Sequence, residues 1–267
     1  MSRPENLPDF NSPPLDEVVV GVQFAPASNY SSVFAKDVWG LFSDSYPLVQ
    51  EQPAIEPSFE TFGGPRPQPG MSFEFGHRPL QNRLWFVSDD QSHLIQFQND
   101  RLLLNWRRRQ PNQTYPRFEG IADAFQTHLN TLQGFFEASL KIPLDVNQAE
   151  VTYINNIPVD DYSSVGEWLR FWNVENIDVE NVSFQFGEVI YEPGGRPYAR
   201  LLHELTSVIS RDGRAKAFRL SLIFRGKPYT GNSPADAMKF IHIGREKIVT
   251  RFAEMTTEKA HKIWERK

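Results

Sequence analysis

The stretch SVISRDGRAKAFRLSLIF, residues 207–224, contains two apolar runs joined by a tight turn. Asp212 and Gly213 lie between the runs, and an Asp-Gly pair at this position is the strongest short-range signal of a β-hairpin. After the turn, one face of the second run carries Phe218, Leu220, Leu222 and Phe224, and the other carries Arg219, Ser221, Ile223 and Arg225. This period of two predicts an antiparallel sheet with one covered face.

The hairpin belongs to the second of two units that have the same order of elements. This unit opens with a strand, AEVTYINNIP at 149–158, and a short helix, VGEWLRFW at 165–172. Three longer strands follow, VSFQFGEVIY, PYARLLHELTSVIS and AKAFRLSLIFRGK. Ser233-Pro234 then opens a long helix with a buried stripe, and a short helix ends at Trp264.

The first unit shows the same order. It has a β-branched strand, EVVVGVQFAP at 17–26, and a helix, SSVFAKDVWGLFSDSYP at 31–47. A meander of RLWFVS, HLIQFQ and RLLLNW leads into a helix over about 116–140. Between helix and meander lies a proline-rich connection, residues 52–82, which cannot pair in a central sheet and is expected to form a surface arm.

Each unit therefore reads strand, helix, three strands, helix, and each long helix must cover one face of an antiparallel sheet. The fold class expected is α+β with two pseudo-repeated units, 1–145 and 146–267. The pattern leaves open whether they form one sheet or two, or one continuous domain. By analogy of element order, the architecture is TATA-binding-protein-like or helix-grip-like, and such an analogy does not fix function.

Composition limits the function classes. The chain has 267 residues, a formal net charge of -5 and no cysteine, which excludes disulfides, thiolate zinc sites and cysteine nucleophiles. No apolar stretch approaches the ~18 residues of a membrane span, and the N-terminus lacks a signal-peptide pattern. We therefore expect a cytoplasmic protein without membrane contact.

Catalytic motifs are not found in the sequence. It lacks a nucleophile elbow, a zinc-protease motif and both common phosphate-binding glycine motifs. His203 and Glu204 alternate on a strand and point to opposite faces, and His242 and Glu246 are favoured as a solvated pair one helical turn apart. The sequence predicts no catalytic residue, metal site or cofactor, although an enzyme with an unfamiliar site stays open.

Charge is distributed unevenly. Residues 145–192 are strongly acidic, which favours a solvated face over a surface that steers a basic partner. The sign then reverses around the hairpin. A basic stripe on paired strands would consist of Arg211, Arg214, Lys216, Arg219 and Arg225.

A second basic group follows the last meander strand, RLLLNWRRR at 101–109. Alternation places Asn105, Arg107 and Arg109 on the face opposite to Leu104 and Trp106. Together with residues near the next helix start, they form an anion-site candidate for a phosphate or a partner carboxylate. Its members are Asn105, Arg107, Arg108, Arg109, Tyr115 and Arg117. The alternative, which the pattern favours, is that these arginines mark the place where the strand ends in solvent.

Several segments together resemble one known family. They are PPLDEVVVGVQF, SYPLVQEQPAIEP, LIQFQNDRLLLNWRR with YPRFE, EVTYINNI, and FAEMTTEKAHKIW, and they span nearly the whole chain. The chain is similar to a sporadically distributed family of bacterial and archaeal proteins of about this length, to which no activity is assigned. The resemblance implies no cofactor or catalytic residue, and sporadic occurrence would suit an accessory of a defence or toxin-antitoxin system.

The function expected from these features is that of a non-enzymatic binding protein. It would recognise a protein partner, or its own copy, through the outer face of a sheet and the arm at 52–82. The alternative is a nucleic-acid or nucleotide binder that uses the arginines at 107–117 with aromatic rings as stacking platforms.

Overall fold

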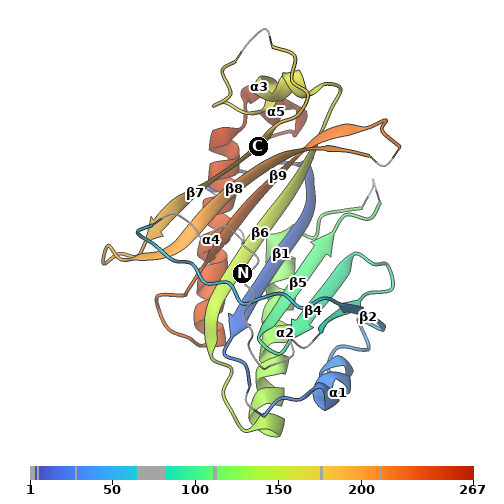
Figure 1. Cartoon of the computed structure of the whole chain (residues 1–267), viewed down its shortest axis with the longest axis vertical. Helices are drawn as coiled ribbons and strands as arrows, with labels where there is room; N and C mark the ends of the chain where they lie inside the picture. Colours follow the sequence, from blue (N-terminus) through green and yellow to red (C-terminus); the bar gives the residue numbers. More distant parts are fainter. Residues whose placement is uncertain are drawn as a thin grey trace.

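The computed structural model describes residues 4, 6–27, 29–64, 82–110, 113–174, 177–210 and 212–267. Its strands are β1 (Leu15–Phe24), β2 (Leu48–Gln52), β3 (Arg83–Val87), β4 (His93–Gln98), β5 (Arg101–Arg107), β6 (Val146–Val159), β7 (Ser183–Tyr191), β8 (Pro197–Ile209) and β9 (Lys216–Gly226). All are antiparallel neighbours in one nine-stranded sheet, in the order β2-β3-β4-β5-β1-β6-β9-β8-β7 (Figure 1). The expected α+β class with antiparallel strands is confirmed.

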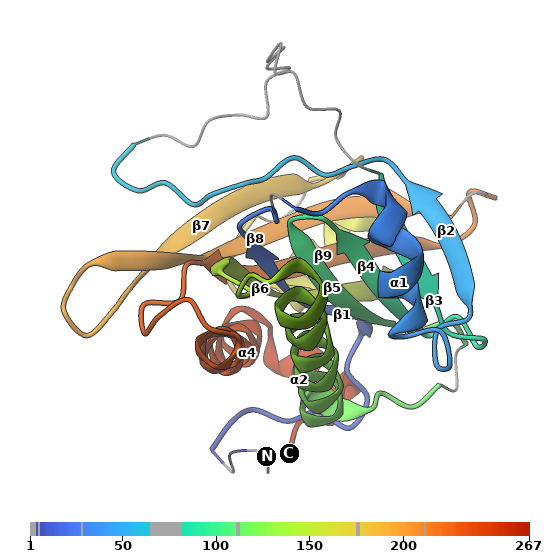
Figure 2. The same ribbon diagram turned by 90° about the horizontal axis from the view of Figure 1, so that it is seen from below.

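The helices are α1 (Ala35–Gly40), α2 (Arg117–Phe135), α3 (Val165–Trp168), α4 (Pro234–Met255) and α5 (Glu258–Ile263). A π-helical segment, Phe136–Leu140, continues α2, and short 3-10 turns precede α1 and α3. The long helices α2 and α4 lie side by side on one face of the sheet (Figure 2). In the described part of the chain, none of these helices has the length and apolar character to cross a membrane.

The pairing of β1 with β6 joins the two halves of the chain at the middle of the sheet. Val19 pairs with Thr152, and the flanking strands β5 and β9 continue the sheet on either side. The structure thus has a single sheet, which answers the question that the sequence leaves open. The duplication and the analogy to saddle-shaped folds stay predictions.

Alternation along the strands separates a covered face from an open face. On β9, Phe218, Leu220 and Phe224 are fully buried under the helices, whereas Arg219 is exposed on the other face. The close approach of α4 depends on Gly244, because a Cβ there would lie 2.6 Å from the Phe224 ring. The helices therefore occupy one face and leave the other for side chains with polar ends.

Local signals set the beginnings of the helices. Ser233 and Asp236 form a capping box at α4, with Pro234 at the first helical position. Two predicted helices are shorter than expected: the segment 31–47 is helical only through a 3-10 turn and α1, and the segment 165–172 only over α3. The exposed edge strand β2 follows directly, and its sequence LVQEQ has no apolar alternation that would predict it.

Candidate binding face of the sheet

The arm predicted at 52–82 crosses the open face of the sheet. Its described part, residues 52–64, leaves β2 and runs across the strands on the side opposite to α2 and α4 (Figures 1 and 2). Residues 65–81 lie outside the described residues. An extended segment that crosses strands cannot join the sheet's backbone ladder, so its backbone groups need other partners.

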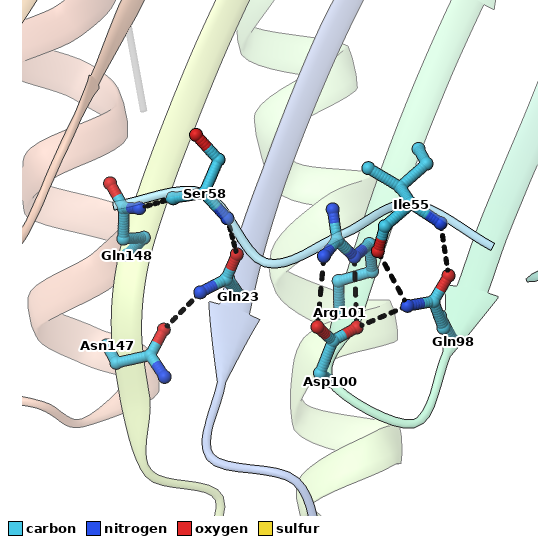
Figure 3. A network of polar contacts seen from close by, with 8 residues as sticks. All are labelled: Gln23, Ile55, Ser58, Gln98, Asp100, Arg101, Asn147 and Gln148. Carbon is cyan, nitrogen blue, oxygen red and sulfur yellow. Dashed lines mark hydrogen bonds and ion pairs between the residues drawn. The ribbon is translucent and has the colours of Figure 1, made fainter. Parts of the chain in front are cut away.

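The first contact is a pair of hydrogen bonds between Gln98 and Ile55 (Figure 3). The Ile55 N–H donates to Gln98 Oε1 at 2.9 Å, and Gln98 Nε2 donates to the Ile55 carbonyl at 2.9 Å. Gln98 is almost fully buried and also donates to Asp100, which holds Arg101 through two hydrogen bonds of 2.9 Å. The amide of Gln98 therefore binds both backbone groups of Ile55, as a residue of a neighbouring strand would.

The second contact repeats this arrangement three residues later, at Ser58. The Ser58 N–H donates to Gln23 Oε1 at 3.4 Å, and Gln148 Nε2 donates to the Ser58 carbonyl (Figure 3). Gln23 is itself oriented by Asn147, at 3.1 Å. Gln148 is buried, and its Oε1 has no hydrogen-bond partner among the residues that the structure describes. Three glutamines from β4, β1 and β6 thus hold two backbone positions of the arm.

The third contact is ionic and centres on Glu60. Glu60 Oε2 lies 2.8 Å from Arg200 Nε, and Glu60 Oε1 lies 2.7 Å from Arg225 Nη2. The Glu60 side chain is only 4% exposed, so both arginines and the carboxylate are largely removed from water. Arg200 also donates to the Thr61 carbonyl at 2.6 Å and lies over the Phe62 ring. We call Arg200 and Arg225 the arginine clamp.

A cavity of about 140 Å³ lies between the arm and the sheet. Its lining includes Leu103, Glu150 and Arg225 from three strands. Burial raises the pKa of the Glu150 carboxyl group, while the positive charges of Arg225 and Arg101 act in the opposite direction. The arm therefore leaves space between itself and the sheet, beside the Glu150 carboxyl group.

The anion-site candidate does not form one site. Asn105 lies on the open face, donating to Glu17 at 2.6 Å, and accepts from Gln96. Arg107 and Arg109 both donate to the Gln91 carbonyl, at 3.2 Å each. Burial lowers the pKa of Arg107, with a further lowering by Arg109, while Glu17 acts in the opposite direction. These three residues lie at the end of β5, where Asn105 and the two arginines have separate hydrogen-bond partners.

The remaining members lie elsewhere. Tyr115 and Arg117 line a cavity of about 60 Å³ on the helix side, together with Tyr153 and Arg245. The Tyr115 and Tyr153 hydroxyls are 3.3 Å apart, and Arg117 pairs with Asp9 at 2.9 Å. The Arg108 N–H donates to the Asp16 carbonyl. The chain passes from the open face to the helix side between β5 and α2, which separates the two groups.

The second basic stripe is also divided. Arg225 belongs to the arginine clamp, and Arg219 donates to Asn156 on the same face. Lys216 lies over the Tyr162 ring on the helix side. Arg214 lies in the exposed turn, 3.8 Å from Asp212, and Arg211 lies outside the described residues. Among the described members of this stripe, Arg225 alone contacts the described part of the arm.

Sequence reasoning missed the residues that bind the arm. Gln98 ends β4, and Gln23 and Gln148 lie one and two residues from the end of a strand, where a glutamine is usually explained as a solvated end. Glu60 and Arg200 are 140 residues apart, so no local pattern connects them. One available signal was the alternation of β8, which places Arg200 on the same face as Arg225, its partner in the register.

No protein-family model matches the chain, and no curated protein matches it.

Proposed function

We propose that this chain is a non-enzymatic binding protein that recognises a protein partner by holding an extended, acidic segment of that partner on the arm-covered face of the sheet. The observation that supports this most directly is the way in which the arm is held. Gln98 and the pair Gln23 and Gln148 bind the N–H and carbonyl groups of single arm residues. Backbone recognition of this kind accepts many sequences.

The spacing of the contacts defines the conformation of the ligand. The two backbone positions, Ile55 and Ser58, are three residues apart, and Pro57 lies between them. A polyproline II helix has three residues per turn, so successive turns present equivalent backbone groups to one surface. The partner segment would therefore be extended and compatible with proline.

The arginine clamp defines the charge of the ligand. Arg200 and Arg225 share one carboxylate, Glu60, in a site that is largely closed to water. Without that carboxylate, two positive charges would lose their partner in a partly desolvated site, which is unfavourable. A partner segment must supply an acidic group at this place.

The nucleic-acid alternative has weaker support on this face. Arg101 is bound to Asp100, and Arg200 and Arg225 are bound to Glu60, so each of these guanidinium groups already has a carboxylate partner. A nucleic-acid surface works through positive charge that is free to replace counterions. Mixed arginines, glutamines and carboxylates fit a peptide better than a phosphate backbone.

The proposal is tested with a synthetic fluorescent peptide, residues 52–64, and the full chain carrying Glu60→Ala. In this variant the tethered arm loses its clamp contact, so it competes less well for the face. We expect the peptide to bind the variant, and binding to weaken by about tenfold or more when the peptide carries the same Glu-to-Ala change or the chain also carries Arg225→Ala. Fluorescence anisotropy gives the dissociation constants.

Arg219→Ala is the matched control, because Arg219 lies on the same strand and face but contacts Asn156 instead of the arm. It should leave peptide binding unchanged. If the peptide does not bind the Glu60→Ala chain, or binds it equally well when its own Glu60 is replaced by Ala, the proposal is wrong. A steeply salt-dependent affinity for single-stranded nucleic acid, lost with Arg107→Ala and Arg109→Ala, would support the alternative instead.

A further inference from the structure

The strand β7 ends the sheet and pairs on one side only, with β8. It has nine residues, SFQFGEVIY, and within the described part of the chain no strand lies on its outer side. An edge of this length exposes unpaired backbone groups that another strand can bind. The opposite edge, β2, has five residues.

Two features that usually protect an edge strand, proline and basic side chains, are missing from β7, and its register shift lies at the end of the strand, between Ile190 and Tyr191. Its sequence contains no proline, lysine or arginine, and its one charged residue is Glu188. That carboxylate is directed to its own subunit, where Oε1 accepts from His203 Nε2 at 2.7 Å and Oε2 accepts from Arg251 Nη2 at 2.6 Å. The Glu188 charge is therefore engaged within its own chain and does not oppose the approach of another strand to this edge.

Exposed aromatic rings lie beside this edge. Phe171 and Phe186 are 48% and 45% exposed, and both rings contact Phe184. Phe186 also stacks on the His203 ring, with centroids 4.3 Å apart and planes within 9° of parallel. Large rings that are half-exposed but fixed in position are common at protein interfaces.

We propose that β7 is the self-association surface of this protein, where it pairs antiparallel with β7 of a second copy about Gly187. The sequence can pair with itself in that register without bringing like charges together. The pairs would be Phe184 with Ile190, Gln185 with Val189, and Phe186 with Glu188, so no like charges lie opposite each other. A symmetric interface requires such self-complementarity, and this requirement favours a second copy over an unrelated strand.

Gly187 is the residue that meets its own copy on the two-fold axis. Any side chain at that position would lie opposite an identical side chain, and Gly187 has none. The axis is perpendicular to the sheet, because the two edges run antiparallel in one continuous sheet. Both arm-covered faces would then lie on the same side of the dimer, while α4 of each copy lies on the other.

Light scattering coupled to size-exclusion chromatography tests this surface on the full chain. The wild-type chain should elute with twice its monomer mass. In the proposed register, Gln185→Lys with Val189→Lys places lysines opposite each other twice, and this double variant should be monomeric. Gln185→Lys with Val189→Glu places opposite charges at the same positions and should restore the dimer.

Lysine at 185 can still contact Glu204, which Gln185 contacts at 2.5 Å, whereas lysine at 189 lies opposite Arg200 of β8 in the same copy. Val189→Lys alone is therefore the control, because it places no like charges across the proposed interface and should stay dimeric. Circular dichroism checks that the variants are folded. A wild-type monomer across the accessible concentration range would overturn the proposal, and so would a dimer that persists with two lysines. If the wild-type chain is a dimer but the Lys-Lys and Lys-Glu variants are both monomeric, the proposed register about Gly187 is wrong.

Discussion

Gln98 and Ile55 exchange two hydrogen bonds of 2.9 Å, so that a buried side-chain amide on β4 pairs with both backbone groups of one residue in the arm. The arm thereby behaves as a ligand attached to its own receptor.

Replacing Gln98 by Ala should release the arm without unfolding the sheet. The freed Ile55 groups can bind water once the arm lifts, so the free energy of unfolding should fall by only about 1–2 kcal/mol. Hydrogen exchange of the segment 53–62 should become faster. Gln96→Ala is the control, because Gln96 lies on the same strand and face but bonds to Arg83 and Asn105. Equal exchange in both variants would contradict the prediction.

Gly244→Ala should destabilise the protein although alanine favours helices. The new Cβ would lie 2.6 Å from Phe224 Cδ1, in a site where that ring is fully buried. Overpacking of this kind costs about 1–3 kcal/mol, more than the gain of about 1 kcal/mol in helix propensity. Gly134→Ala in α2 meets no atom within 4 Å and should stabilise. Urea unfolding of the two variants should therefore shift in opposite directions.

His128 should make the protein less stable as the pH falls. Burial, with a smaller effect of His93, lowers the pKa of His128 to about 4. The unfolded chain, with a pKa near 6.5, binds the proton first, so stability is complete above about pH 6.5 and is lost as the pH falls toward about 4. The loss from this residue is at most about 3 kcal/mol.

His128→Gln cannot titrate and can still bond to the Tyr46 hydroxyl, which lies 3.0 Å from His128 Nε2. Its stability should depend less on pH between about 6.5 and 4 than that of the wild-type chain, as measured by urea unfolding at several pH values. If the unfolding free energies of the two proteins fall in parallel with pH, the His128 imidazole is not the source of the pH dependence.

Ser233→Ala should weaken the start of α4. The Ser233 side chain accepts from the Asp236 N–H, and its hydroxyl group is the largest cause that lowers the pKa of Asp236 to about 2. Loss of a cap typically costs about 1 kcal/mol. Ser233→Asn retains a cap and should stay near wild-type stability in thermal unfolding, so an equal loss in both variants would argue against the capping role.

Strand positions and faces could be predicted because they depend on neighbours in the sequence. The Asp212-Gly213 turn and the alternation from Phe218 to Phe224 are local signals, and the structure has the hairpin with these rings buried. The capping box at Ser233 is local as well. Each of these features acts within a few residues, where propensity and pattern are informative.

The path of the arm could not be predicted for the opposite reason. Gln23, Gln98, Gln148 and Arg200 come from four strands, and only the finished sheet brings them beneath Ile55, Ser58 and Glu60. Geometry of the same kind divides the residues of the anion-site candidate. Arg107 and Arg117 are close in sequence, but the connection before α2 carries Arg117 to the helix side.

The central pairing of β1 with β6 also affects how the chain folds. Every residue pair in this ladder is more than 120 positions apart, from Leu15 with Asn155 to Phe24 with Val146. At synthesis rates of ≈ 5–20 residues per second, β6 is made on the order of ten seconds after the valine-rich β1. One edge of β1 stays unpaired during this time. Folding dominated by such distant pairing is slow, on the order of milliseconds to seconds. The emerging first half therefore exposes an open strand edge, and a chaperone that covers it should raise the yield of folded protein.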